Sequence, residues 1–240
     1  MNEIVSASVR ERVGVDTPTG IVDFYEGIEV AEHPLFVTLA SRPVDLSTLW
    51  VLVANMNEGI SPNFVRWLAS TIARLDDSRI ASLLAKQLAD ELGNGDPARI
   101  HRTLLERFVA GLEPWRPRGP AGRSLDAGRR LAELASDVFE SRSTFESIGG
   151  MIVAEIFAKK MDHCLGEEIR RQALVPREAL LWLEIHEVLE IDHAEDSRGL
   201  AELVPSGGAA ADEAWRGARA LWAAMWGFLD DVMAAAYAHA

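Results

Sequence analysis

The chain has 240 residues, 48% of them hydrophobic, and a formal net charge of −13. This length and composition can supply the core of one domain. The acid excess argues against nucleic-acid partners and anionic membranes, because no basic patch stands out to neutralise phosphates. The one cysteine, Cys164, excludes an internal disulfide framework and a multi-cysteine zinc site. Neither a long apolar run nor a signal-like N-terminus is present, so we expect a cytoplasmic protein without membrane contact.

Apolar residues recur at helical spacing along nearly the whole chain, and alternating β-type runs are few. Proline and glycine punctuate this pattern at the expected helix starts and ends. The pattern predicts helices near residues 20–31, 33–41, 45–59, 62–75, 77–92, 97–113, 123–140, 143–172, 177–203 and 211–238. We therefore expect an all-α, single-domain bundle over residues 1–240. The irregular segment 113–120 is interpreted as a connection within it.

Three candidate metal ligands occur in the first half of the chain, on helix faces that the pattern assigns to the core. Glu58 lies near the end of the helix expected over Leu46–Gly59. Glu91 lies at a helix C-terminus, where the helix dipole disfavours an anion. His101 follows a glycine-rich turn and shares its face with leucine and phenylalanine. Taken singly, each has a plain alternative: an exposed or ion-paired acid, or a hydrogen-bonded structural histidine.

The second half of the chain supplies four more candidates. Glu155 shares a helix face with Ile148, Met151 and Ile152. The others, His186, Glu190 and His193, are spaced i, i+4 and i+7, within roughly a 60° sector of one apolar helix face. Burying two imidazoles and a carboxylate is unfavourable unless something pairs with them, and a metal ion binds both groups. The seven candidates are enough for two metal ions.

Other motifs are weaker. A ferritin-like diiron bundle needs two Glu-x-x-His motifs, and only Glu190–His193 supplies one. A haem with a histidine axial ligand would leave the core acids unexplained. We interpret Cys164 as a small buried hydrophobe, and His33, His163 and His239 as structural or exposed. Trp182, one turn before His186, is either core or pocket wall. We predict no catalytic residue beyond the metal ligands and no site for an organic cofactor.

The candidate set resembles the haem-oxygenase-like diiron oxidases and oxygenases, also described as iron-containing redox enzymes. Their fold is shared with pyrroloquinoline-quinone synthase and thiaminase-II-type proteins. The family pattern corresponds here to Glu58, to Asp90-Glu91-Leu92-Gly93-Asn94-Gly95 followed by His101, to Glu155, and to His186-x3-Glu190-x2-His193. The similarity covers roughly residues 33–203. One position departs from the pattern: Glu190 stands where aspartate is usual.

The resemblance implies a haem-oxygenase-like bundle that binds two Fe2+ ions, one often weakly held, with O2 as co-substrate. It implies oxidation of a small-molecule substrate, with electrons from an external donor, in the biosynthesis of a specialised metabolite. Because the sequence reveals no long apolar tunnel, we favour a small amine- or amino-acid-type metabolite over a fatty acid. The reaction would be N-oxygenation or oxidative C–C cleavage. We also expect a homodimer.

A function of another class remains open. The chain could be a cofactor-independent oxidase, or a thiaminase- or quinone-synthase-like protein of the same fold. The same acids and histidines would then bind substrate instead of metal. Metal content after anaerobic loading with Fe(II) separates the two hypotheses.

Overall fold

A computed structural model describes residues 17–41, 46–120, 123–171 and 175–237, without the side chains of residues 178 and 187–195. The described chain is helical and contains no strand, which confirms the predicted all-α fold. Its α-helices are α2 (Pro18–Glu26), α3 (Pro34–Ser41), α4 (Leu46–Gly59), α5 (Phe64–Ile72), α6 (Ser78–Glu91), α7 (His101–Leu112), α8 (Asp126–Ser136), α9 (Thr144–Arg170), α10 (Leu181–Leu203) and α11 (Ala209–Tyr237). Short 3-10 turns connect several of them, at Val30–Glu32, Gly93–Gly95, Pro97–Arg99, Glu113–Trp115 and Arg177–Ala179.

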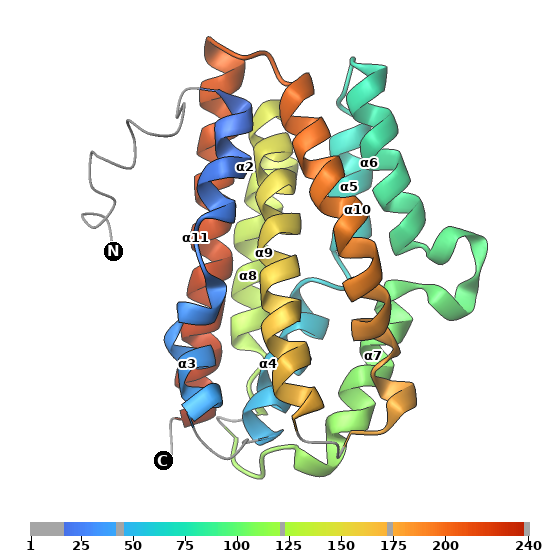
Figure 1. Cartoon of the computed structure of the whole chain (residues 1–240), viewed down its shortest axis with the longest axis vertical. Helices are drawn as coiled ribbons and strands as arrows, with labels where there is room; N and C mark the ends of the chain where they lie inside the picture. Colours follow the sequence, from blue (N-terminus) through green and yellow to red (C-terminus); the bar gives the residue numbers. More distant parts are fainter. Residues whose placement is uncertain (1–16, 42–45, 121–122, 172–174, 238–240) are drawn as a thin grey trace.

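Helix α9 occupies the middle of the bundle, with α11 and α2 on one side and α10 on the other (Figure 1). A capping box starts it: the Ser143 hydroxyl accepts from the Glu146 amide, and the Glu146 carboxylate accepts from the Ser143 amide. Gly149 allows α11 to approach closely, because a Cβ there would collide with the carbonyl of Ala214. The α9 and α11 backbones are therefore closely packed at this point.

Four predicted helices were wrong in continuity. The helix expected over 20–31 ends at Glu26, before a 3-10 turn at Val30–Glu32, and the helix expected over 177–203 begins with a separate 3-10 turn at Arg177–Ala179. The other two interruptions lie nearer the candidate site. The helix expected over 97–113 is broken at Ile100, whose φ of −60° and ψ of 121° are extended, so α7 begins at His101. The helix expected over 123–140 ends as an α-helix at Ser136 and continues as a π-helix over Asp137–Ser141. There the Arg74 guanidinium donates to the carbonyl oxygens of Phe139 and Arg142, which gives those carbonyls a partner outside the helix. Both irregular segments border the candidate site.

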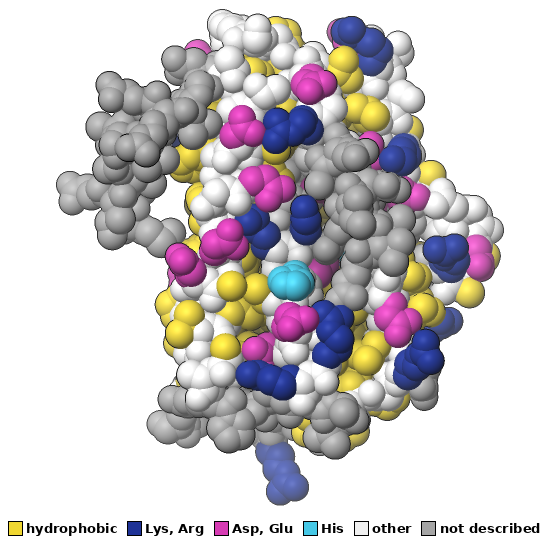
Figure 2. All heavy atoms as spheres, viewed as in Figure 1, with side chains coloured by type: hydrophobic (Ala, Val, Ile, Leu, Met, Phe, Trp, Pro, Cys, Tyr) yellow, Lys and Arg dark blue, Asp and Glu magenta, His cyan; other side chains and the backbone are white. Residues whose placement is uncertain are grey.

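The molecular surface carries charges of both signs. Figure 2 shows acidic and basic side chains interspersed over the displayed face. No helix in the described part of the chain combines the length and apolar character needed to cross a membrane.

Candidate metal centre

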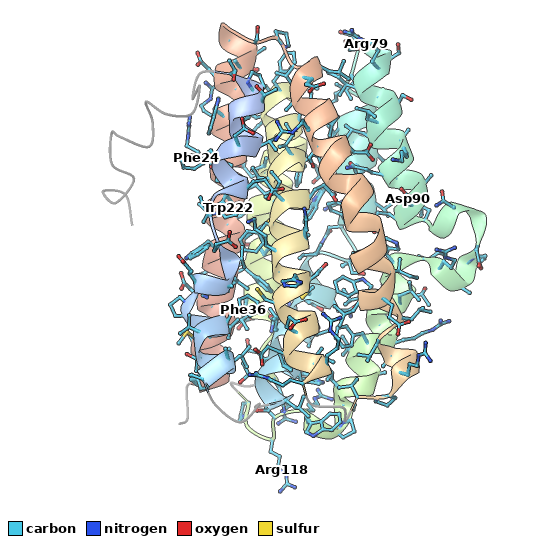
Figure 3. All side chains as sticks on the ribbon, in the orientation of Figure 1. Phe24, Phe36, Arg79, Asp90, Arg118 and Trp222 are labelled. Carbon is cyan, nitrogen blue, oxygen red and sulfur yellow. The ribbon has the colours of Figure 1, made fainter. Side chains whose placement is uncertain are left out.

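A left-handed turn brings the end of α6 to the start of α7. Gly93, Asn94 and Gly95 have φ values of 75°, 52° and 85°, a conformation that glycine and asparagine adopt most readily. The Asn94 side-chain amide donates to Asp90 Oδ1 at 2.6 Å. The turn projects from the bundle in Figure 1, and Figure 3 labels Asp90 at its base. It places Glu91, the last residue of α6, opposite His101, the first residue of α7.

Glu91 and His101 meet below this turn. The distance from Glu91 Oε1 to His101 Nδ1 is 3.1 Å, and the side chains are 16% and 5% exposed. The two atoms are close, yet among the described residues the buried Nδ1 has no partner in hydrogen-bonding geometry. A ring nitrogen forms hydrogen bonds in the plane of its ring, so proximity alone does not pair these two atoms.

His186 joins them from α10. Its ring centroid lies 4.6 Å from that of His101 and 4.0 Å from that of Trp182. Its Nδ1 is 2.8 Å from the Trp182 carbonyl oxygen, which can only accept, so this geometry assigns the proton to Nδ1. With the proton on Nδ1, Nε2 is the nitrogen that would act as a metal ligand. A ring N–H held by a backbone carbonyl is the usual arrangement behind a metal-binding histidine.

Glu91, His101 and His186 form what we call the three-residue cluster. Each offers one donor atom, and all three donor atoms lie within 4.8 Å of one another. Bonds of about 2.0–2.2 Å to a divalent metal would place any two donors at most about 4.4 Å apart. A small side-chain adjustment therefore suffices for these residues to bind one ion, and the donor set suits iron.

The cluster borders a cavity of about 100 Å3 inside the bundle. Its walls are mainly apolar and come from α4, α5, α8, α9, α10 and α11. Two carboxylates of α9, Glu155 and Asp162, line it as well. Glu155 was predicted from the sequence. Asp162, only 1% exposed, was not, although its spacing of i+7 from Glu155 places both on one face of α9 and could have revealed it.

The remaining sequence candidates are not observed among the described residues of the cavity, except Trp182. Glu58 was expected on a core face, but its side chain is 35% exposed and pairs with Arg129 of α8 at 2.9 Å. It does not line the cavity, because this last turn of α4 directs it towards the bundle surface. Glu190 and His193 follow His186 along α10, and their side chains lie outside the described residues. Trp182, left open between core and pocket wall, lines the cavity.

Cys164 behaves as the sequence suggested. Burial, with a smaller contribution from Glu29, raises the pKa of its thiol to about 11. A thiol with that pKa is protonated at neutral pH and is a poor nucleophile.

The sequence matches the family model described as iron-containing redox enzyme over residues 59–226. The chain belongs to this family of iron-containing redox enzymes. The resemblance inferred from its motifs is thereby confirmed. A solved structure, that of a CADD-like protein of unknown function from Nostoc punctiforme PCC 73102, superposes with a TM-score of 0.66. The two share 15% identity over 92% of this chain and 94% of that one, so the likeness supports the haem-oxygenase-like fold alone. No curated protein matches the sequence.

Proposed function

We propose that this iron-containing redox enzyme is an O2-dependent non-haem diiron oxidase or oxygenase. Its substrate would be a small amine- or amino-acid-type metabolite, and its electrons would come from an external donor. The observation that carries the proposal is the three-residue cluster: two imidazoles and a carboxylate from three helices, with donor atoms within 4.8 Å of one another. His101 is buried and the other two side chains are half-buried, so a cation between them would offset the cost of removing the Glu91 charge from water.

The ligands would be shared between two ions. Glu91, His101 and His186 supply the described part of the set. Glu155 lines the same cavity, and Glu190 and His193 lie one and two turns beyond His186 on α10. These six residues offer three imidazoles and three carboxylates. That mixture is suited to Fe2+, which binds both ligand types.

The bound Fe2+ ions would supply the electrons and open coordination positions needed to reduce O2. The protein's own residues set the conditions. The Trp182 carbonyl fixes the proton of His186 on Nδ1, so that Nε2 is the nitrogen that would bind a metal ion. Most of the cavity wall is apolar, which disfavours water inside and would strengthen electrostatic interactions there.

The cavity favours a small, cationic substrate. Its volume of about 100 Å3 suits a small molecule better than a long acyl chain. Asp162 lines the cavity and is not among the proposed ligands, so its charge is not neutralised by the ions. An ammonium group would be attracted to this carboxylate and a free fatty-acid carboxylate repelled. This supports an amine or amino acid over a fatty acid.

Anaerobic loading with Fe(II), followed by removal of free metal and iron analysis, tests the proposal. We expect close to two irons per chain, and O2 uptake that depends on the bound iron. His101→Ala should lose iron and O2 uptake together. His163→Ala removes an exposed imidazole of α9 outside the cavity and should lose neither. Absence of bound iron in the wild type would replace the proposal with the cofactor-independent alternative.

A further inference from the structure

The cavity extends along α9. Residues Ala154 to Asp162 of α9 line it, which corresponds to about 12 Å along the helix at 1.5 Å per residue. Helix α10 runs antiparallel to α9, so its first turns, with Trp182 and His186, lie beside the later turns of α9 (Figure 1). Phe139 instead contacts α9 at Gly150, one turn before Ala154. Trp182, His186 and Asp162 therefore lie towards one end of this stretch, and Phe139 and Glu155 lie towards the other.

Two aromatic rings form the cavity wall at the end nearer Ala154. The rings of Trp67 and Phe139 lie 5.3 Å apart at an interplanar angle of 33°. Trp67 is fixed by its indole N–H, which donates to Ser136 Oγ at 3.0 Å. A Cβ added to Gly150 would lie only 3.0 Å from Phe139 Cε1, so the phenyl ring rests on the backbone of α9. No free space separates this wall from the helix behind it.

The π-helix is what aims Phe139 into the cavity. Asp137–Ser141 inserts a wider turn after α8, and such turns recur at functional sites. Arg74 holds it from outside: besides the two carbonyl bonds described above, the guanidinium donates to Ser147 Oγ at 2.8 Å. Phe139 is only 1% exposed. The position of its ring is thus set by hydrogen bonds independent of the metal ligands.

We propose that the Trp67–Phe139 pair is the specificity wall of this enzyme and limits the apolar part of its substrate to about six carbon atoms, judged from cavity size. The cavity volume is about 100 Å3. A dry protein cavity of about 150 Å3 accommodates benzene, so a space of about 100 Å3 suits an apolar group of that size or smaller. The substrate class is a compact aliphatic or aromatic group on a polar head that reaches the three-residue cluster. The assignment of the head to the reacting end rests on the proposed function; the size limit does not.

Binding of homologous probes to the metal-free full-length protein tests the limit. Linear primary amines and linear primary alcohols, from three to ten carbons, are titrated calorimetrically. Using both series removes dependence on head-group charge. In the wild type each added methylene should tighten binding about fourfold until the chain fills the cavity, and affinity should then fall. Phe139→Ala should move that maximum about three carbons longer, because it opens the wall.

Two further variants make the result specific. Phe157→Ala removes an equally buried phenyl ring that packs on Trp222 and does not line the cavity, and its maximum should stay at the wild-type length. Ala135→Leu fills the cavity one turn before Phe139 and should shorten the maximum. An unchanged maximum in Phe139→Ala, an equal shift in Phe157→Ala, or no binding of either series would overturn the proposal. Iron loading of Phe139→Ala should remain at the wild-type level, so loss of iron binding in the wild type would count against the diiron function and not against the wall.

Discussion

Buried imidazoles occur on both sides of this bundle, and they are paired differently. On the side of α2 and α11, His33 is fully buried, with its ring 4.8 Å from that of Trp226. Its Nδ1 accepts the Leu35 amide proton at 3.1 Å, and its Nε2 donates to Asp230 at 3.1 Å. Both nitrogens are satisfied with the ring neutral. His33 is therefore a structural histidine that caps α3.

His101, on the cavity side, is nearly as buried but differently surrounded. Its Nδ1 faces a carboxylate and a second imidazole without forming a hydrogen bond among the described residues. The packing around the two histidines also differs. Near His33, Trp222 packs against Tyr25 and Phe157 at centroid distances of 4.6 and 5.0 Å, and Figure 3 shows Trp222 between the helices. Near His101 there is a cavity. Burial alone does not identify a functional histidine; an unsatisfied nitrogen beside open space does.

The largest expected effect separates these two regions by metal affinity. His101→Ala or His186→Ala should weaken Fe(II) or Co(II) binding at least hundredfold, because each removes a ligand outright, whereas outer-shell changes already cost about 10–100-fold. His33→Ala should change that affinity less than about twofold, because His33 lies outside the cavity. Anaerobic calorimetric titration measures the metal affinity of all three variants. Equal losses in the His33 and His101 variants would show that affinity follows fold stability and not ligation.

A second experiment compares two glutamates that the sequence treated alike. Glu155→Gln removes a cavity carboxylate and should lower bound iron from near two to near one per chain. Glu58→Gln removes an exposed partner of Arg129 and should leave the iron content unchanged. Its effect on stability should be below about 0.5 kcal/mol, as for other solvent-screened pairs. Iron analysis after gel filtration measures the iron content of both variants. A loss of one iron in Glu58→Gln would show that Glu58 is a ligand.

The third prediction concerns the structural histidine. His33→Ala should lower the free energy of unfolding by about 2 kcal/mol, because the Leu35 amide loses its acceptor and a cavity remains at the start of α3. Urea denaturation followed by circular dichroism measures the change. The exposed His163 provides the matched control, since His163→Ala should stay within about 0.5 kcal/mol of the wild type. A smaller change in His33→Ala than in the control would contradict the capping role.

Much of the site could be predicted from sequence because local patterns encode it. The Gly93-Asn94-Gly95 turn requires positive φ values, and it fixes Glu91 and His101 next to each other. The i+4 and i+7 spacing on α10 was equally plain. In both cases the relation spans only a few residues, so helix geometry is sufficient.

The rest depended on contacts distant in sequence. Helical periodicity assigned Glu58 to the core face, and it could not show that Glu58 pairs with Arg129, 71 residues away. The π-helix depends on Arg74, which precedes Phe139 by 65 residues. Asp162 lay in a long helix that is buried nearly all round, so its carboxylate was not conspicuous. Periodicity assigns a face; it does not tell which neighbour will meet that face.

The smallest effect is a pH dependence carried by His33. Burial lowers the pKa of its imidazole below the ordinary 6.5, and the charge and hydrogen bond of Asp230 partly oppose that shift. The unfolded chain therefore binds a proton at this group more readily than the folded chain does. Stability must rise with pH wherever the unfolded state holds more protons. The contribution of His33 is thus fully present above its unfolded pKa and declines as the pH falls through 6.5 towards the lower folded value.

The sign of this dependence can be isolated by a variant that cannot titrate. The difference in unfolding free energy between the wild type and His33→Gln, measured in urea from about pH 5 to 8, removes the other titrating groups that both share. That difference should shift in favour of His33→Gln as the pH is lowered below 6.5, where protonation begins to favour the unfolded wild type. A shift in the opposite direction would mean that Asp230 outweighs burial and that the folded chain holds His33 as a cation. The contrast with His101 would then concern charge as well as pairing.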